Sequence, residues 1–134
     1  DADGQHDIRD VDSFVKAAEG TNAGMVIGNR MSDTNTMPYI RVCTNRFMSK
    51  LLSWMTRQYV PDSQCGFRLI KRQVLERVKL ESSKYEIESE LIIKAARAGF
   101  KIESVPIKTV YMGERSRINP ILDTLRFIRL MLKS

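Results

Sequence analysis

Two carboxylates one residue apart open the chain, and their spacing fits a metal site. Asp1 and Asp3 flank an alanine, and Gly4 follows them. In an extended segment residues i and i+2 point to the same side, so both carboxylates can face one point. Anionic oxygen ligands suit Mg²⁺ or Mn²⁺, which commonly share their coordination with substrate phosphates. The alternative is an acidic loop that precedes a helix.

A helix and a buried strand are predicted after this motif. Asp7 is typical of a helix N-cap, the apolar positions over 11–18 recur at helical spacing, and Gly20 is the expected stop. The apolar run 24–28 indicates a buried strand, and Arg30 follows its carboxyl end. A guanidinium there can bind phosphate with two hydrogen bonds, whereas elsewhere on a surface it would be a solvated charge.

The rest of the chain alternates helices and strands, as an α/β fold does. Pro106 favours an edge position or a bulge for the last strand, because proline has no backbone N–H to donate. The spacing of apolar residues and the turn residues predict helices over 38–59, 71–78 and 85–98 and strands over 67–70 and 100–112.

Two of the predicted helices combine an apolar face with a basic one. Arg46, Lys50 and Arg57 share one side of the helix over 38–59, and residues 118–134 form a basic amphipathic C-terminal helix. Each helix can pack on its own domain with its basic face in solvent, or lie at a membrane surface.

Composition narrows the classes of protein. The 134 residues suffice for one domain with a core. The chain contains no run of about 18 apolar residues, which is the pattern that would indicate a membrane span. Cys43 and Cys65 match no metal-site spacing, so free thiols in a reducing compartment are expected. The net charge of +6 favours an anionic partner, but no nucleic-acid-binding motif is present. Because the chain starts at Asp1 without methionine, we expect it to be part of a longer protein.

Six short motifs follow one another along the chain: DADGQH at 1–6, VIGNR at 26–30, DSQCGFR at 62–68, ESEL at 88–91, VPI at 105–107 and ERSR at 114–117. In this order they resemble glycosyltransferase family 2, and within it the dolichol-phosphate mannose synthase and polyprenyl-phosphate glycosyltransferase branch. The resemblance implies an α/β, GT-A-type glycosyltransferase fold, C-terminal portion only, with a mixed, mainly parallel sheet. Residues 1–134 would be a single partial catalytic domain without the nucleotide-binding N-terminal half.

The resemblance also implies roles for individual residues. Asp1, Asp3 and Gln5 would hold a divalent metal, Mg²⁺ or Mn²⁺, against the donor diphosphate. Arg30 and Arg117 would be catalytic cations that receive the lipid phosphate or the leaving group, with Arg117 standing where the family has lysine. The other residues implied in substrate binding are Arg41, Asp62, Glu90, Arg115 and Ser116.

The implied activity of the intact enzyme is inverting transfer of a hexose from a GDP- or UDP-sugar to a dolichyl or undecaprenyl phosphate. The enzyme would be cytoplasmic and peripheral at the cytoplasmic face of a membrane, and the 134-residue chain alone would be inactive. A phosphate acceptor arrives already ionised, so no side-chain base is expected. Two alternatives remain open: transfer to a sugar hydroxyl with Asp62 or Glu90 as base, or a non-catalytic module that binds phosphates or membranes.

Overall fold

The computed structural model describes residues 7–82, 86–108 and 128–129. The predicted metal ligands Asp1, Asp3 and Gln5 lie outside these ranges. So do Arg115, Ser116 and Arg117, and all of the predicted C-terminal helix except Ile128 and Arg129. Within the described ranges, no helix combines the length and apolar character needed to span a bilayer.

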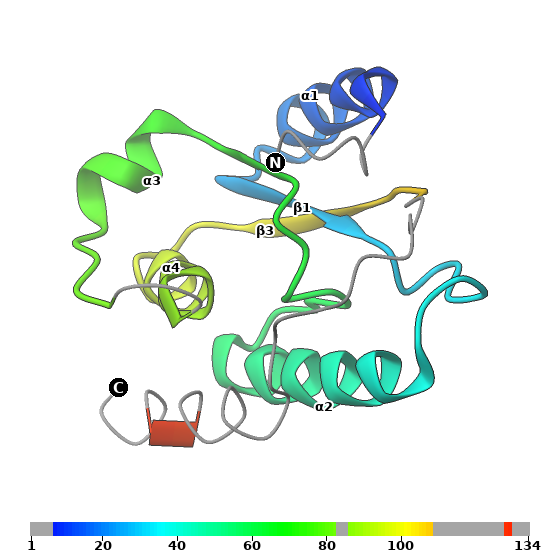
Figure 1. The fold of residues 1–134 in the computed structure, drawn as a ribbon. Helices are drawn as coiled ribbons and strands as arrows, with labels where there is room; N and C mark the ends of the chain where they lie inside the picture. Colours follow the sequence, from blue (N-terminus) through cyan, green and yellow to red (C-terminus); the bar gives the residue numbers. More distant parts are fainter. Residues whose placement is uncertain (1–6, 83–85, 109–127, 130–134) are drawn as a thin grey trace.

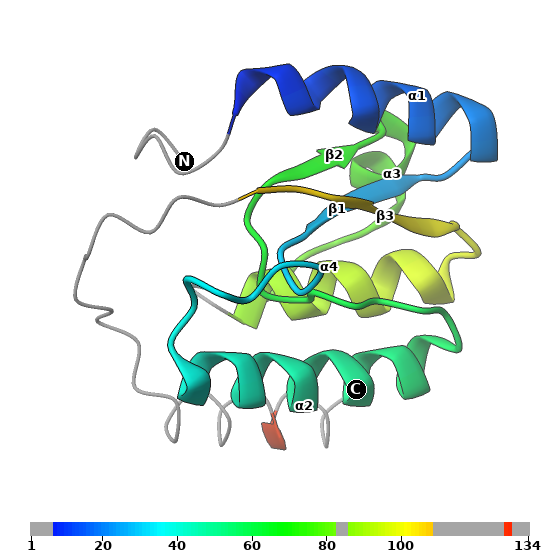
Figure 2. The same cartoon turned by 90° about the vertical axis from the view of Figure 1, so that its right-hand side faces the viewer.

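A three-stranded mixed sheet in the order β2-β1-β3 lies at the centre of the fold; Figure 1 labels β1 and β3, and Figure 2 labels all three strands. β1 (Met25–Asn29) pairs antiparallel with β2 (Arg68–Ile70) and parallel with β3 (Ile102–Pro106). One of these two pairings is parallel, so the described part of the sheet is mixed without being mainly parallel. β3 lies at an edge of the described sheet, as Pro106 predicts.

The central strand is buried on both of its faces. Met25, Val26 and Ile27 have no exposed surface. In register, Ile27 lies opposite Arg68 of β2 and Ser104 of β3. An apolar strand without alternation is typical of a strand covered on both sides, which is why the sequence at 24–28 reads as a continuous apolar run.

Helices cover the two faces of the sheet (Figures 1 and 2). The 3₁₀ turn Ile8–Asp10 leads into α1 (Val11–Thr21), which lies on one face. On the other face lie α2 (Tyr39–Thr56) and α4 (Glu86–Arg97), which contact each other. A short helix, α3 (Arg72–Arg77), follows β2. The fold therefore has three layers: α1, the sheet, and the pair of α2 and α4.

α1 and α4 are each followed by a residue type that tolerates a left-handed backbone. α1 continues through Gly20 to Thr21, so the expected stop at Gly20 is wrong by one residue. Asn22 takes the left-handed conformation with φ 53°, a role that asparagine shares with glycine. Gly99 has φ 85° and follows α4, as predicted. Asp7 caps the 3₁₀ turn, because its side chain accepts from the backbone N–H of Arg9.

Close packing around Gly28 brings distant segments together at the carboxyl end of β1. A Cβ at Gly28 would lie 2.7 Å from Cδ1 of Ile107 and 3.0 Å from Sγ of Cys65. The backbone N–H of Ile107 also donates to the carbonyl oxygen of Asn29 at 3.1 Å. The segment after β3 and the loop before β2 therefore meet where β1 ends, which is where ligands bind in open α/β sheets.

Candidate functional site

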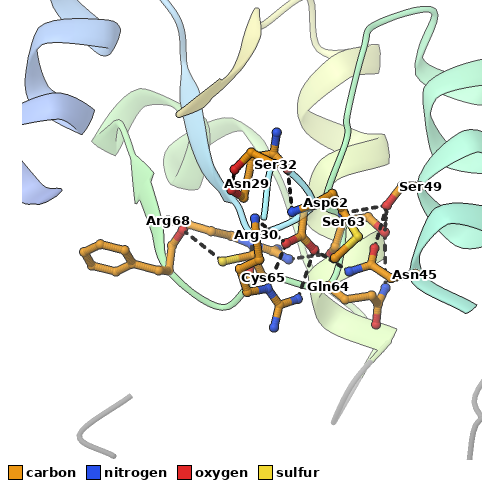
Figure 3. Close-up of polar contacts among 12 residues, drawn as sticks. Asn29, Arg30, Ser32, Asn45, Ser49, Asp62, Ser63, Gln64, Cys65 and Arg68 are labelled. Carbon is orange, nitrogen blue, oxygen red and sulfur yellow. Dashed lines mark hydrogen bonds and ion pairs between the residues drawn. The ribbon is translucent and has the colours of Figure 1, made fainter. Parts of the chain in front are cut away.

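A buried ion pair joins Arg30, just beyond β1, to Asp62 in the loop before β2 (Figure 3). Oδ2 of Asp62 accepts from the backbone N–H of Arg30 at 3.0 Å and from its Nε at 2.8 Å. Oδ1 accepts from Nη2 of Arg30 at 2.9 Å. The side chain of Asp62 is fully buried, while that of Arg30 is 15% exposed. One carboxylate thus fixes both the backbone and the guanidinium of Arg30.

The ionisation of Asp62 depends on these partners. Burial raises the pKa of the Asp62 carboxyl, but the hydrogen bonds and charge of Arg30, with a hydrogen bond from Asn45, outweigh burial and hold the pKa below its ordinary value. The desolvation cost of this buried charge is offset only while the partners of Asp62 stay in place. In the structure Asp62, which the sequence offers as a candidate base, orients Arg30.

Three polar side chains on the inner side of α2 attach it to the loop that carries Asp62. Nδ2 of Asn45 donates to Oδ1 of Asp62 at 2.6 Å, and Oδ1 of Asn45 accepts from the hydroxyl of Ser49 at 2.9 Å. The Ser49 hydroxyl accepts from the backbone N–H of Ser63 at 2.9 Å. The hydroxyl of Ser53 accepts from the backbone N–H of residue 60 at 2.9 Å. We call Asn45, Ser49 and Ser53 the polar seam.

The same loop is held from the side of the sheet by Arg68, whose side chain is 6% exposed. Its Nε donates to the carbonyl oxygen of Cys65 at 2.7 Å, and its Nη2 donates to that of Ser63 at 2.8 Å. Its Nη2 also reaches Oε2 of Glu88 at 3.2 Å. The arginine of the DSQCGFR motif therefore has a structural role, because its hydrogen bonds hold the loop that carries Asp62.

Glu90 on α4 anchors the segment that precedes the helix. Its carboxylate accepts from the backbone N–H groups of Glu81 at 3.0 Å and Ser82 at 2.8 Å, and it pairs with Nζ of Lys94 at 2.6 Å. Burial raises the pKa of Glu90, but the bonds from Lys94 and the two backbone N–H groups outweigh it and lower the pKa to about 2. A carboxylate with this pKa is a weak proton acceptor at neutral pH.

Of the remaining predicted site residues, Arg41 is the one that lies within the described ranges. Arg41 lies in the first turn of α2, is half-buried, and precedes Asn45 by one helical turn. Across the described part of the chain, no group of three His, Cys, Asp or Glu side chains could hold a metal ion. The predicted ligands Asp1, Asp3 and Gln5 are outside that part, so the metal site stays a prediction.

The polar seam is the part of the site that sequence reasoning missed. Its residues were masked by the apolar periodicity of α2, in which Val42, Met48 and Leu52 alternate with them. The available signal was their own spacing of i, i+4 and i+8, which puts three polar side chains on one helix face beside apolar ones. A polar row within an apolar face indicates a buried partner.

Sequence comparison relates the chain to glycosyltransferases. It is 31% identical over 116 residues to UDP-N-acetylglucosamine–dolichyl-phosphate N-acetylglucosaminyltransferase of Methanococcus voltae, covering 83% of this chain and 46% of that protein. It is 26% identical over 113 residues to polyprenol monophosphomannose synthase of Mycolicibacterium smegmatis, covering 80% of this chain and 42% of that one. An uncharacterized protein of Methanocaldococcus jannaschii is 38% identical over 116 residues, which are 83% of this chain and 48% of that protein.

The chain thus spans about half the length of the curated relatives it matches. No family model matches it, and no solved structure does. The named relatives are glycosyltransferases, and two of them are named for dolichyl-phosphate or polyprenol-phosphate products or substrates. The mixed α/β architecture is consistent with part of such a domain.

Proposed function

We propose that this chain is the acceptor-side half of a GT-A glycosyltransferase that transfers a hexose from a nucleotide sugar to a polyprenyl phosphate. An oxygen of the lipid phosphate attacks the anomeric carbon, and the bond from that carbon to the donor diphosphate breaks. The nucleoside diphosphate leaves with the bonding electrons, and the anomeric configuration inverts. The identity of the sugar, for which mannose is one candidate, and the identity of its carrier, GDP or UDP, are part of this proposal.

The observation that carries the proposal is the orientation of Arg30 at the carboxyl end of β1. Its guanidinium is fixed by Asp62 through two side-chain hydrogen bonds, at 2.8 Å and 2.9 Å. A preoriented cation lowers the cost of bringing two anionic phosphates together, because little reorganisation is needed when charge develops. Arg117, outside the described residues, is proposed to act with it.

A divalent cation bound by Asp1, Asp3 and Gln5 would neutralise charge on the leaving nucleoside diphosphate. The donor set is suitable in its chemistry, because two carboxylates and an amide oxygen are hard ligands. The described residues supply no competing metal cluster.

The choice of acceptor is supported by how the two candidate bases are used. Asp62 is engaged by Arg30 and Asn45, and Glu90 by Lys94 and two backbone N–H groups. Both carboxylates have lowered pKa values, and that of Glu90 is about 2. A sugar hydroxyl needs a base that can take its proton, whereas a phosphate monoester is already ionised near neutral pH. The phosphate acceptor is therefore favoured over the hydroxyl.

The outer face of α2 supports a peripheral position at a membrane surface. Phe47 and Trp54 are 55% and 78% exposed on this helix. Arg46, Lys50 and Arg57 are exposed beside them, as the predicted basic stripe requires. Exposed aromatic rings next to basic residues are typical of helices that lie in the interface of an anionic bilayer.

The test uses the full-length enzyme with a nucleotide sugar, Mg²⁺ or Mn²⁺, and a short-chain polyprenyl phosphate. Arg30→Ala is expected to lower kcat/KM by roughly a hundredfold or more, as loss of a transition-state cation does. Arg30→Lys keeps the charge near Asp62 and guards against misfolding, and it should still be impaired because lysine cannot bind in a bidentate manner. The control is Arg72→Ala, because Arg72 is a 90% exposed arginine on α3.

Three outcomes would contradict the proposal. The first is full activity of Arg30→Ala. The second is full activity in the presence of a metal chelator. The third is transfer to a sugar hydroxyl with none to the polyprenyl phosphate.

A further inference from the structure

The carboxylate of Asp62 has all of its acceptor positions filled by two residues. A carboxylate offers about four lone-pair sites. Arg30 fills three of them and Nδ2 of Asn45 fills the fourth, at 2.6 Å from Oδ1. Asp62 is fully buried, and Asn45 is 5% exposed. The orientation of the carboxylate is thus set from two sides, by the arginine that it holds and by an amide on α2.

The amide of Asn45 can take only one orientation. Its Oδ1 accepts from the Ser49 hydroxyl at 2.9 Å, while its Nδ2 faces Asp62. A flipped amide would place an oxygen against a buried carboxylate, which the hydrogen-bond network forbids. Ser49 is itself fixed, since it accepts from the backbone N–H of Ser63. Figure 3 shows this row of contacts running from α2 to Arg30.

Apolar packing between α2 and the loop would tolerate small shifts, because it is not directional. Hydrogen bonds lose strength steeply when their angle changes, so the polar seam fixes the height and rotation of α2 relative to Asp62. Asn45 is the only seam residue for which the structure gives a direct contact with this carboxylate within the described chain.

We propose that Asn45 is a positioning residue: it orients Asp62 and thereby aims the guanidinium of Arg30 at the substrate phosphate. The proposal rests on the function proposed above. It assigns to α2, which no motif of the resemblance includes, a direct part in setting the geometry of the site.

The substitution Asn45→Asp gives a signature that a merely structural role would not. The new carboxyl would lie beside Asp62, and two carboxyls that share a site cannot both ionise easily. At low pH the new group is protonated and can donate to Asp62 as the amide does. At high pH it is charged, repels Asp62 and competes for Arg30. Other ionisable groups near the pair are Arg68 and the Cys65 thiol, which both interact electrostatically with Asp62, and Arg41, which lies one helical turn before Asn45 on α2.

The expected result in the full-length enzyme is a new pH dependence. The ratio of kcat/KM for Asn45→Asp to that of the unchanged enzyme should fall roughly tenfold to a hundredfold as pH rises from about 5.5 to 8.5, as misaligned groups produce. The matched control is Ser53→Ala, which breaks the seam at residue 60 without touching Asp62. Its ratio should be constant with pH.

A second readout does not depend on turnover. The ¹⁵N NMR signal of the Arg30 Nε–H, identified by its loss in Arg30→Lys, should titrate in Asn45→Asp with the same midpoint as the activity ratio. It should not titrate in the unchanged protein. If Asn45→Asp does not fold, Asn45→Ala replaces it, and the Arg30 signal must move further than it does in Ser53→Ala.

An Arg30 signal that stays in place in the folded Asn45 variants would overturn the proposal. So would an activity ratio that does not change with pH while the enzyme remains active. If the unchanged enzyme transfers nothing to the polyprenyl phosphate, the proposed function fails, and the NMR titration still decides whether Asn45 positions Arg30.

Discussion

Replacing Glu90 by glutamine should separate its structural role from a catalytic one. Glu90 is 5% exposed and holds two backbone N–H groups and Lys94. Glutamine has a similar size but carries no charge and offers one oxygen in place of two. We expect Glu90→Gln to lower the free energy of unfolding at pH 7 and to leave transfer activity per folded molecule unchanged.

The magnitude follows from the pKa of Glu90, which is about 2 in the folded protein against an ordinary value of 4.5. Each unit of pKa corresponds to about 1.4 kcal/mol, so the ionised form contributes about 3 kcal/mol to folding. Because folding lowers this pKa, the contribution is complete above pH 4.5 and is lost as pH falls toward 2. The difference between the two proteins should therefore shrink across that window.

Chemical denaturation of the full-length enzyme between pH 7 and pH 3 measures this difference. Glu76→Gln is the matched control, because Glu76 forms the same kind of i,i+4 pair, with Arg72, on the exposed surface of α3. Its effect should stay within about 0.5 kcal/mol. If Glu90→Gln unfolds like the unchanged enzyme but no longer transfers sugar, the reasoning is refuted, and Glu90 becomes the base of a hydroxyl-acceptor enzyme.

Three further predictions concern other parts of the chain. Gly28→Ala should lower the free energy of unfolding by about 1–3 kcal/mol in denaturation experiments, because its Cβ would lie 2.7 Å from a packed side chain. Gly20→Ala in α1 should raise it by about 0.5–1 kcal/mol, because its Cβ would meet nothing within 4 Å. The double change Phe47→Ser and Trp54→Ser should weaken flotation of the enzyme with anionic liposomes at least tenfold while leaving its unfolding free energy unchanged, since both side chains are exposed; equal flotation would exclude this face from membrane contact. Asp62→Asn should lower the free energy of unfolding by about 3 kcal/mol and activity by more than tenfold, because the largely buried Arg30 loses its counter-charge; retained activity in a stable variant would argue against the role of Asp62.

The main elements could be predicted from local sequence. The apolar run at 24–28 became β1, and the periodic segment at 38–59 became α2 over Tyr39–Thr56. The prediction that Arg30 follows a buried strand is confirmed, since that placement needs only the strand itself. Periodicity reports which face of an element is covered, and that is local information.

The partners within the site could not be predicted in the same way. Arg30 and Asp62 are 32 residues apart, and nothing in their spacing shows that they meet. Asn45 sits in an apolar helix whose inward face was expected to be hydrophobic. Glu90 is held by the backbone of residues 81 and 82, and a backbone donor leaves no trace in residue types. Long-range polar contacts arise from the tertiary arrangement and not from the pattern of any one element.

The position of β1 in the centre of the sheet has a consequence during synthesis. Counted from the first residue of β1, its neighbour β2 begins 43 residues later in the chain and β3 begins 77 residues later. A ribosome that adds roughly 5–20 residues per second would thus leave one edge of β1 open for several seconds after β1 itself has been made. For that time the strand presents three apolar residues and unpaired backbone groups, which is the state in which strands of different nascent chains associate. We therefore expect the yield of soluble protein to depend on the time that passes between the synthesis of β1 and the synthesis of β3.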